Sequence, residues 1–359
     1  MSYAIAAAGT GGHVYPGLAV GEALVDLGVD RADVLFVGGD RLEAQVFPAA
    51  GFPFLEVRLA GLRRSPTVAN LKIPATVVRA VRSISEALRS RRVGALLGMG
   101  GYVTVPAALA ARRRRIPFAV CEQNASAGLA NRVAGRLADR RFSSFPETDG
   151  LPRSEWMGNP IRRSLATFRR TDLLADSFDR YGLEPDTPVL GVFGGSLGAK
   201  AVNDAMRRLA EGWAGRPFQI LHLAGASHAE EVASAAAASP LRWVVLDYED
   251  RMELFYAACD LVVARAGGAV AELIATGTPA VLVPGTFGSG GHQEANAAAL
   301  SATGAAYVLG EHRLDDLPTV VEGLLFDDDA LATMAERAAE MARPDAAWNI
   351  ARALRELHG

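Results

Sequence analysis

The first residue with an evident chemical use is a histidine that follows a glycine-rich turn. Gly9–His13 (GTGGH) comes after the apolar segment Tyr3–Ala8 and precedes a helix predicted over residues 16–27. Backbone N–H groups at such a strand-to-helix junction can bind an anion. The imidazole of His13, with an ordinary pKa near ~6.5, can act there as an acid or a base. A tight turn alone would explain the glycines but not the histidine after them.

The same spacing argues against two common nucleotide-binding motifs. The third glycine of a G-x-G-x-x-G fingerprint would fall at Val14, and the chain contains no G-x-x-x-x-G-K-[ST] sequence. A nicotinamide-dependent enzyme and a P-loop enzyme therefore lose support, and no cofactor is expected.

A second polar group follows another predicted strand. Residues 117–120 are apolar, and Cys121 is followed by Glu122, Gln123 and Asn124. At the carboxyl end of a parallel strand, these three polar side chains are expected to face a ligand. A loop in which Glu and Asn serve only as caps is the alternative.

The second half of the chain carries two comparable segments. Gly194–Gly198 (GGSLG) is a phosphate-type loop in which Ser196 adds a hydroxyl donor. Arg265–Gly268 opens a helix with Glu272 near its start. A carboxylate there can accept both hydroxyls of a ribose while the first amides of the helix hold a diphosphate. The alternative for Glu272 is complementation of the helix dipole.

These segments need a framework of strands and helices to hold them. Strand, glycine turn and helix succeed one another in both halves, which predicts an α/β protein with two Rossmann-like domains. The 359 residues suit two domains. We expect one domain of residues 1–160 and one of residues 161–343, joined near Met157–Pro160, with a helix at about 344–359 packed back on the first. Ligands should bind in a cleft between the domains, at the carboxyl ends of the strands.

The charge of the chain is divided between its halves. Residues 1–163 contain 22 Lys and Arg against 13 Asp and Glu, whereas the remainder contains 15 against 27. The basic half favours an anionic partner. Compositional drift in an arginine-rich protein is the alternative.

The cysteines and the apolar segments indicate the compartment. Cys121 and Cys259 are far apart and form neither a disulfide framework nor a zinc motif, which favours a reducing environment. No export signal and no membrane-spanning helix are expected, because the apolar segments are short and interrupted by Gly and Pro.

The order of these segments resembles that of the MurG family of bacterial glycosyltransferases. Seven stretches recur in family order along nearly the whole chain: Gly9–Val20 (GTGGHVYPGLAV), Gly61–Arg64 (GLRR), Leu96–Ala111 (LLGMGGYVTVPAALAA), Glu122–Arg132 (EQNASAGLANR), Gly158–Arg162 (GNPIR), Gly194–Ala199 (GGSLGA) and His292–Ala297 (HQEANA). Agreement of this extent and order is not expected by chance.

The resemblance implies a GT-B fold, with two Rossmann-like domains facing across a cleft, and a specific reaction. Members of the family move N-acetylglucosamine from UDP-N-acetylglucosamine to the 4-hydroxyl of the muramyl residue of lipid I, the undecaprenyl-linked muramyl-pentapeptide. The product is lipid II for peptidoglycan synthesis, and the reaction inverts the anomeric carbon without a metal. The expected partners are the UDP-sugar, lipid I and the anionic inner surface of the membrane, with no nucleic acid. The chain is expected to be a peripheral protein on the cytoplasmic face of the cell membrane.

The resemblance also assigns roles to individual residues. The contacts to the UDP-sugar fall on Thr10, Gly11, Gly12, Asn124, Arg162, Ser196, Gly267, Gly268, Glu272 and Gln293. The backbone of residues 248–250 corresponds to the segment that recognises uracil. His13 is the expected catalytic base, and Glu122 is the alternative.

The chain departs from the family pattern in five places. Cys121 stands where histidine is frequent, the Arg265–Glu272 stretch is one residue shorter than usual, and Glu249 stands where other members are apolar. The Gly285–Gly291 loop is richer in glycine than in many members, and His292 replaces one of a pair of glutamines that some members carry. The short stretch puts the position of the diphosphate in doubt.

Basic residues flank or interleave a series of apolar residues between positions 63 and 89. The apolar members have helical spacing: Ile73, Val77, Val78, Val81 and Ile84, with Arg63, Arg64, Lys72, Arg79, Arg82 and Arg89 as the basic ones. Together with Arg112–Arg115, such a surface can rest on anionic lipid. A helix that packs these apolar residues on the protein core fits the periodicity equally well.

Two other classes of protein stay open. A different GT-B enzyme, such as a lipid glucosyltransferase or a UDP-sugar epimerase, would share the donor half and differ in the acceptor half. A non-catalytic relative would have lost His13 or Glu122, and both are present.

Overall fold

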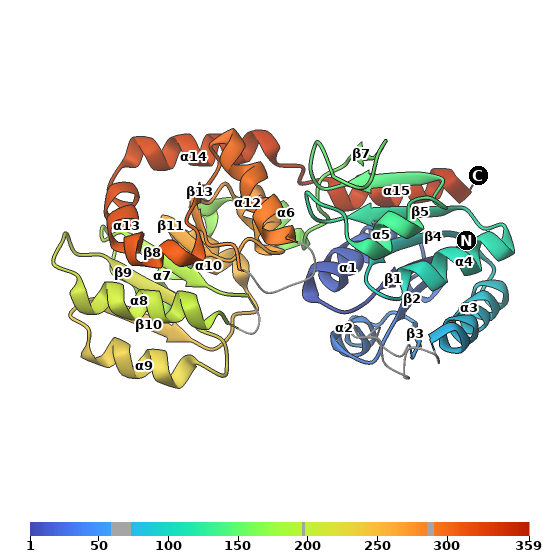
Figure 1. The fold of residues 1–359 in the computed structure, drawn as a ribbon, viewed down its shortest axis with the longest axis horizontal. Coiled ribbons are helices and arrows are strands. Elements are labelled where there is room, and N and C mark those ends of the chain that lie inside the picture. Colours follow the sequence, from blue (N-terminus) through green and yellow to red (C-terminus); the bar gives the residue numbers. More distant parts are fainter. Residues whose placement is uncertain (59–72, 196–197, 286–290, 359) are drawn as a thin grey trace. The chain divides into compact units, whose positions relative to one another are not determined.

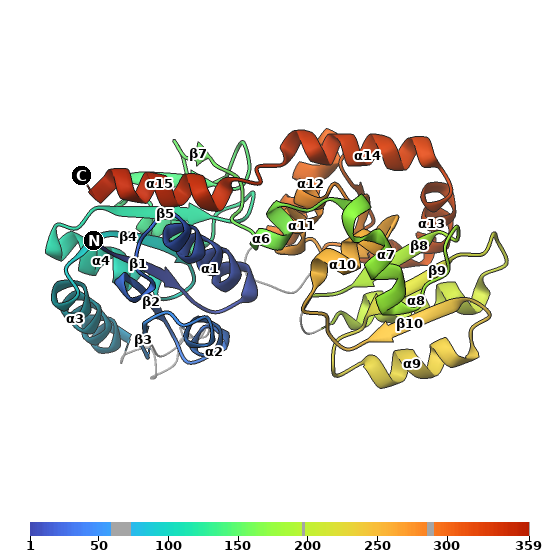
Figure 2. The same ribbon diagram turned by 180° about the vertical axis from the view of Figure 1, so that it is seen from behind.

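The computed structural model describes residues 1–58, 73–195, 198–285 and 291–358. The chain divides into two compact units, shown in Figure 1 and from behind in Figure 2. Unit 1 comprises Met1–Arg162 and Arg343–Gly359, and unit 2 comprises Arg163–Ala342. The chain therefore leaves unit 1, builds unit 2 and returns.

Unit 1 is built on a seven-stranded parallel sheet with the order β3-β2-β1-β4-β5-β6-β7. The strands are β1 (Ser2–Ala7), β2 (Val34–Gly38), β3 (Phe54–Glu56), β4 (Val93–Gly100), β5 (Phe118–Glu122), β6 (Arg140–Ser143) and β7 (Glu155–Trp156). The helices are α1 (Gly11–Asp26), α2 (Leu42–Ala49), α3 (Ile73–Ser90), α4 (Thr104–Arg114), α5 (Leu129–Ala134) and α15 (Ala346–His358), with a short 3-10 turn at Arg31–Asp33.

The strands of unit 1 are apolar because both faces of the sheet are covered. Tyr3 and Ile5 of β1 pack in one buried cluster with residues of α1 and α15, and Ala4 and Ala6 pack in a second cluster with residues of α3 and α4. Figure 2 shows α15 lying beside α1. This two-sided burial accounts for continuous apolar strands rather than alternating ones.

Unit 2 repeats the plan with a six-stranded parallel sheet of order β10-β9-β8-β11-β12-β13. Its strands are β8 (Val189–Phe193), β9 (Gln219–Leu223), β10 (Arg242–Leu246), β11 (Leu261–Ala264), β12 (Ala280–Leu282) and β13 (Tyr307–Val308). Its helices are α6 (Arg163–Ala166), α7 (Arg170–Tyr181), α8 (Lys200–Gly212), α9 (Ala229–Ala238), α10 (Met252–Ala258), α11 (Ala269–Thr276), α12 (His292–Thr303), α13 (Leu317–Leu325) and α14 (Asp328–Met341), with a 3-10 segment at Glu311–Asp316.

In both units the strand order reverses beside the first strand. The Gly9–His13 turn follows β1 and the Gly98–Tyr102 segment ends β4, its neighbour in the sheet of unit 1. Likewise, Gly194–Gly198 follows β8 and Arg265–Gly268 follows β11, its neighbour in unit 2. Open parallel sheets bind ligands at such switch points, outside the carboxyl ends of the strands. The fold therefore places the polar segments of each unit together.

Two element boundaries near the predicted site differ from the sequence prediction by two residues or more. Helix α1 begins at Gly11 rather than at Pro16, which lies inside it. Because proline favours the first turn of a helix, the prediction began the helix at Pro16, which is too late. Inside α1, Pro16 has no N–H to donate to the carbonyl of Gly12. Strand β5 runs to Glu122 instead of ending at residue 120.

Candidate active site

His13 lies in the first turn of α1, directly after the carboxyl end of β1. Its Nδ1 atom is 3.3 Å from the hydroxyl oxygen of Thr10, the residue that precedes the helix. The ring packs against Gly100, where φ is +112° and an added Cβ would come within 2.6 Å of the imidazole Cδ2. Only glycine fits at position 100 with His13 in this place, so β4 helps to position the ring.

The predicted contacts Gly11 and Gly12 are the first two residues of α1. The first turn of this helix, all of which the structure describes, contains no acidic residue. The positive end of the helix dipole is therefore not offset by a carboxylate of α1 itself, which suits the binding of an anion at this turn.

Glu122 ends β5 and is buried, with 1% of its surface exposed. One carboxylate oxygen accepts hydrogen bonds from the backbone N–H groups of Gln123 (3.1 Å) and Asn124 (3.0 Å) and from the Asn124 amide (2.8 Å). The other accepts from the backbone N–H of Gly128 (3.1 Å) and the side-chain amide of Asn131 (2.8 Å). Because both oxygens are occupied by donors of the protein itself, this carboxylate is suited to holding the following loop in place.

Asn131 is a site residue that the sequence analysis missed. Besides binding Glu122, its Nδ2 donates to the backbone carbonyl of Cys121 (3.1 Å). The same nitrogen lies 3.4 Å from the position of an added Cβ at Gly100, the residue against which His13 packs. Asn131 thus brings the Glu122 loop next to the imidazole. Only its place in α5, close after the EQN segment, could have indicated it.

The expectation that Glu122, Gln123 and Asn124 all face a ligand is wrong for Glu122, whose oxygens bind protein donors, and for Gln123. Its side chain is buried, and its amide donates to the carbonyl of Cys121 (3.0 Å). Since β5 continues to Glu122, the next side chain falls on the opposite face. Cys121, which replaces the histidine frequent in the family, is fully buried in the core, and burial raises the pKa of its thiol well above the ordinary value.

Arg162 belongs to unit 1 and lies over the ring of Tyr15, with its guanidinium carbon 5.6 Å from the ring centroid. The Tyr15 ring in turn packs against Gly11, where an added Cβ would stand 3.3 Å from the ring. The structure thereby brings Arg162 to the N-terminal turn of α1. An arginine and a helix N-terminus together favour an anionic ligand at this place.

The glycine loop after β8 is shaped by close backbone approaches. An added Cβ at Gly194 would stand 2.3 Å from the backbone nitrogen of Ala199, and one at Gly198, where φ is +74°, would stand 2.2 Å from the carbonyl oxygen of Ala224. These glycines are required by the path of the chain. Ser196, the predicted hydroxyl donor of this loop, lies outside the described residues.

Glu272 lies in the first turn of α11, and the hydroxyl of Tyr256 on α10 donates to its carboxylate at 2.9 Å. Tyr256 is itself buried, so this bond orients the carboxylate from the core. Gly267 and Gly268 precede the helix, and no heavy atom lies within 4 Å of an added Cβ at Gly267. The backbone of this turn is therefore open to a ligand.

Gln293 lies in the first turn of α12, where its amide oxygen accepts a hydrogen bond from the backbone N–H of Gly285 (2.8 Å). One turn further on, the buried Asn296 donates to the carbonyl of Ala266 (3.0 Å). Helix α12 thus holds the backbone next to Gly267 and Gly268.

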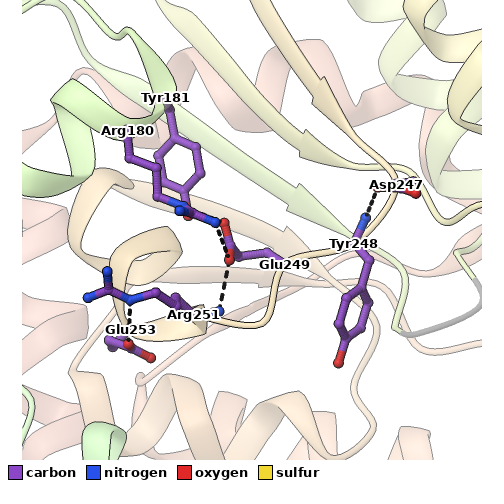
Figure 3. Close-up of polar contacts among 7 residues, drawn as sticks. All are labelled: Arg180, Tyr181, Asp247, Tyr248, Glu249, Arg251 and Glu253. Carbon is purple, nitrogen blue, oxygen red and sulfur yellow. Dashed lines mark hydrogen bonds and ion pairs between the residues drawn. The ribbon is translucent and has the colours of Figure 1, made fainter.

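The segment that corresponds to the uracil-binding one follows β10, and Figure 3 shows its contacts. Tyr248 points away from Glu249 and is 48% exposed. Glu249 is buried: Arg180 donates to its two oxygens at 2.9 and 3.0 Å, the hydroxyl of Tyr181 at 2.7 Å and the backbone N–H of Arg251 at 2.8 Å. These bonds tie the segment to the end of α7.

These contacts also set the charge of Glu249. Burial alone would raise the pKa of its carboxyl, but the hydrogen bonds from Arg180, Arg251 and Tyr181 outweigh burial and hold the pKa below the ordinary value. Burial, together with the neighbouring Glu249 charge, raises the pKa of the Tyr181 hydroxyl. A charged residue can therefore occupy this position because α7 supplies its partners.

The apolar stripe predicted over residues 73–84 is divided in the structure. Ile84 is fully buried, and Val81 is partly buried against the same cluster, so the alternative of packing on the core holds for this part of the stripe. Val78 is 49% exposed, and Leu109 of the adjacent α4 is 40% exposed. Arg79, Arg82 and Arg112–Arg114 are exposed on the same two helices, and the exposed Arg115 directly follows α4. The GLRR motif and Lys72 lie outside the described residues.

Within the described ranges, no helix is long and apolar enough to cross a membrane. In the same ranges, no group of three His, Cys, Asp or Glu side chains is placed to hold a metal ion.

Two Rossmann-like units with glycine turns at their switch points are the architecture of the GT-B fold. Family models divide it in the same way. Residues 3–143 match the glycosyltransferase family 28 N-terminal domain, and residues 189–350 match the glycosyltransferase family 28 C-terminal domain.

Individual relatives indicate a narrower family within this class of glycosyltransferases. Two relatives are named UDP-N-acetylglucosamine--N-acetylmuramyl-(pentapeptide) pyrophosphoryl-undecaprenol N-acetylglucosamine transferase. The protein from Rhodococcus erythropolis is 38% identical and matches over 98% of this chain and 93% of its own length. The protein from Halorhodospira halophila is 41% identical and matches over 99% of this chain and 98% of its own length. The crystal structure of MurG from Acinetobacter baumannii matches with a TM-score of 0.79 and 28% identity, over 99% of this chain and 100% of that one. The chain belongs to the MurG family.

Proposed function

We propose that this protein transfers N-acetylglucosamine from UDP-N-acetylglucosamine to the 4-hydroxyl of the muramyl residue of lipid I, which gives lipid II. The observation that carries the proposal is the match to relatives of this activity along the whole chain, at 38–41% identity. The site residues support it, because each unit has a glycine-rich turn, of a kind suited to an anion, at its switch point. The transfer inverts the configuration at the anomeric carbon.

The donor is assigned chiefly to unit 2. Glu272 accepts the ribose hydroxyls, and the amides of Gly267 and Gly268 face the diphosphate. The backbone of residues 248–250 reads the uracil. The remaining donor contacts are assigned to Thr10, Gly11, Gly12, Asn124, Arg162, Ser196 and Gln293. Helix N-termini and Arg162 then offset the charge of the UDP leaving group, so that no metal is needed.

His13 is the proposed base. A proton on Nδ1 would be held by the Thr10 hydroxyl at 3.3 Å, and Nε2 would then remove the proton from the muramyl hydroxyl. Glu122 is better suited to a positioning role, because five donors of the protein surround its carboxylate. Through Asn124 and Asn131 it would hold the loop beside His13.

The acceptor side is proposed to rest on the anionic inner leaflet of the cell membrane, as a peripheral protein on the cytoplasmic face. Val78 and Leu109 are exposed among arginines on α3 and α4, a composition suited to the boundary of lipid headgroups and acyl chains. Lipid I stays in that leaflet because its undecaprenyl chain is apolar.

A transfer assay tests the reaction. The protein is incubated with radiolabelled UDP-N-acetylglucosamine and detergent-solubilised lipid I, and the expected product is labelled lipid II, formed also in the presence of EDTA. Lipid I is omitted from one control, and a GDP- or ADP-linked sugar replaces the donor in another. Conversion of the free donor to an epimer, or label on a lipid without muramyl-pentapeptide, would instead support the rival GT-B activities.

A further inference from the structure

Glu43 is a buried carboxylate near the Gly9–His13 turn that belongs to none of the motifs described above. It lies in the first turn of α2, after β2, and none of its surface is exposed. Its hydrogen-bond partners within the described residues are two backbone N–H groups and one hydroxyl. Burying a carboxylate is costly unless its hydrogen bonds are made, so these partners are what keep Glu43 in the core.

The partners of Glu43 come from three different segments. One carboxylate oxygen accepts the backbone N–H of Gly9 at 3.3 Å, and the other accepts the backbone N–H of Gly39 at 3.0 Å and the hydroxyl of Tyr102 at 3.4 Å. These segments follow β1, β2 and β4, which are adjacent strands of the sheet. Glu43 therefore joins three loops at the carboxyl edge of unit 1.

Two consecutive glycines make room for this arrangement. An added Cβ at Gly38 would stand 2.7 Å from the Cγ of Glu43, and one at Gly39 would stand 1.6 Å from the hydroxyl oxygen of Tyr102. Any larger residue at either position would displace Glu43 or Tyr102. The local sequence after β2 is thus adapted to a glutamate and a tyrosine that meet at this point.

The loops that Glu43 joins are those that place His13. Gly9 leads directly into the turn in which the backbone N–H of His13 bonds to the Thr10 carbonyl at 3.0 Å. On the other side, an added Cβ at Gly101 would stand 2.1 Å from the carbonyl oxygen of Ala8, so the Tyr102 segment lies against the end of β1. The position of the imidazole therefore depends on the contact between these two loops.

We propose that Glu43 is a positioning residue for His13, acting through the backbone of Gly9 and the hydroxyl of Tyr102. The proposal rests on the proposed function, in which His13 is the base. Glu43 itself does not contact a substrate. Its carboxylate keeps the Gly9–His13 turn and the Tyr102 loop in register, and it does so from a fully buried position.

The chemistry of the Tyr102 contact supports this role. Burial, with the negative charges of Glu43 and Asp40, raises the pKa of Tyr102 to about 12. The phenol therefore stays protonated at neutral pH and can donate to Glu43. A glutamine at position 43 would present an amide N–H₂ to one of these donors, so at least one bond of the three would be lost.

The Glu43→Gln variant tests the proposal against a matched control. Asp139 also accepts a backbone N–H, that of Phe118 at 2.9 Å, but at the amino end of β5, the opposite edge of the same sheet. Glu43→Gln is expected to lower kcat roughly tenfold to a hundredfold, the scale of a displaced catalytic group, with the donor KM unchanged. Asp139→Asn is expected to leave kcat unchanged.

A double-mutant cycle separates positioning from a general structural effect. If Glu43 acts through His13, Glu43→Gln should cause no further loss in a His13→Ala background. The same fold-loss in both backgrounds, or an unchanged kcat in Glu43→Gln alone, would overturn the proposal. Full activity of His13→Ala alone would instead remove the proposed base, and with it this role of Glu43.

Should Glu43→Gln fail to fold, as judged by circular dichroism, Tyr102→Phe allows the same cycle. It removes one of the three donors and leaves the buried carboxylate bonded to Gly9 and Gly39. A loss of kcat that disappears in the His13→Ala background supports the proposal, and an additive loss contradicts it.

Discussion

His13 is the residue on which the proposed chemistry depends most directly. As a base it acts in the transition state, so His13→Ala should lower kcat by roughly a hundredfold or more and leave the donor KM nearly unchanged. Steady-state kinetics with lipid I measures both constants. His312→Ala, an exposed histidine of unit 2, is the matched control and should behave as wild type. If His13→Ala retained the wild-type kcat, another group would have to be the base.

Glu272 offers a second test at this scale. Loss of a charge-assisted contact to the ribose predicts that Glu272→Ala weakens UDP binding by about 1–3 kcal/mol in calorimetry. Tyr256→Phe removes only the 2.9 Å bond that orients the carboxylate, so a smaller loss is expected. If Glu272 merely complements the helix dipole, its removal would change stability and leave UDP affinity as it was.

Residues that carry the proposed chemistry could be found in the sequence, whereas those that position them could not. His13 and Glu272 stand next to glycine turns, and this neighbourhood indicates a ligand. Asn131 and Glu43 have no such context. Their roles follow from packing against Gly100 and Tyr102, which lie 31 and 59 positions away and meet them only in the folded sheet. From the sequence alone, Glu122 is a possible base. The five hydrogen-bond donors that favour a positioning role for it are visible only in the folded structure.

At the scale of elements, the segment after β10 is anchored to α7 by Glu249, and the anchor should depend on pH. The folded pKa of Glu249 is lowered, so its stabilising effect is present above the unfolded value and is lost as pH falls through the folded pKa. Urea unfolding should show wild type more stable than Glu249→Gln near pH 7, with the difference shrinking in acid. Tyr181→Phe, which removes the 2.7 Å bond, should lower stability at pH 7 by about 1–2 kcal/mol. A gap between wild type and Glu249→Gln that is constant with pH would contradict the anchor.

Helix α3 provides a prediction about the membrane. Val78→Asp should reduce sedimentation with anionic vesicles and leave UDP binding intact, since Val78 is exposed. Leu174→Asp, at a comparably exposed leucine of unit 2, should not affect sedimentation. Binding of wild type should fall at high salt, because each nearby arginine contributes about 1 kcal/mol within a Debye length of roughly 8–10 Å. If Val78→Asp and Leu174→Asp released the protein from the vesicles equally, the membrane-binding surface would lie elsewhere.

The helices and strands were predicted well where the periodicity of apolar residues was clear, but their ends were predicted less well. The buried strand β1, Ser2–Ala7, differs by one residue at each end from the apolar segment Tyr3–Ala8. The valine stripe of α3 was ambiguous because helical periodicity shows that one face is apolar without showing what covers it. Here Ile84 packs on the sheet and Val78 does not, a division that depends on the neighbouring α4.

At the scale of the whole molecule, unit 1 is completed by the last helix of the chain. Ile350 of α15 is fully buried in the cluster that contains Tyr3 and Ile5 of β1. Ile350→Ala should destabilise unit 1 by about 2–5 kcal/mol, measured by thermal or urea unfolding, while UDP binding persists below the transition. Arg352→Ala, on the exposed face of the same helix, should change stability little. Equal effects of the two changes would mean that α15 does not belong to the core.

The return of the chain has a consequence for synthesis on the ribosome. Residues 1–162 emerge first, but their core lacks α15 until about 180 further residues, those of unit 2, have been translated. At ordinary rates of translation, synthesis of unit 2 takes on the order of ten seconds or more. During that time the apolar face of β1 and α1 that α15 will cover is accessible to chaperones and to other nascent chains. Unit 2, which is continuous in sequence, can finish folding first, so the half of the enzyme made first is the half that matures last.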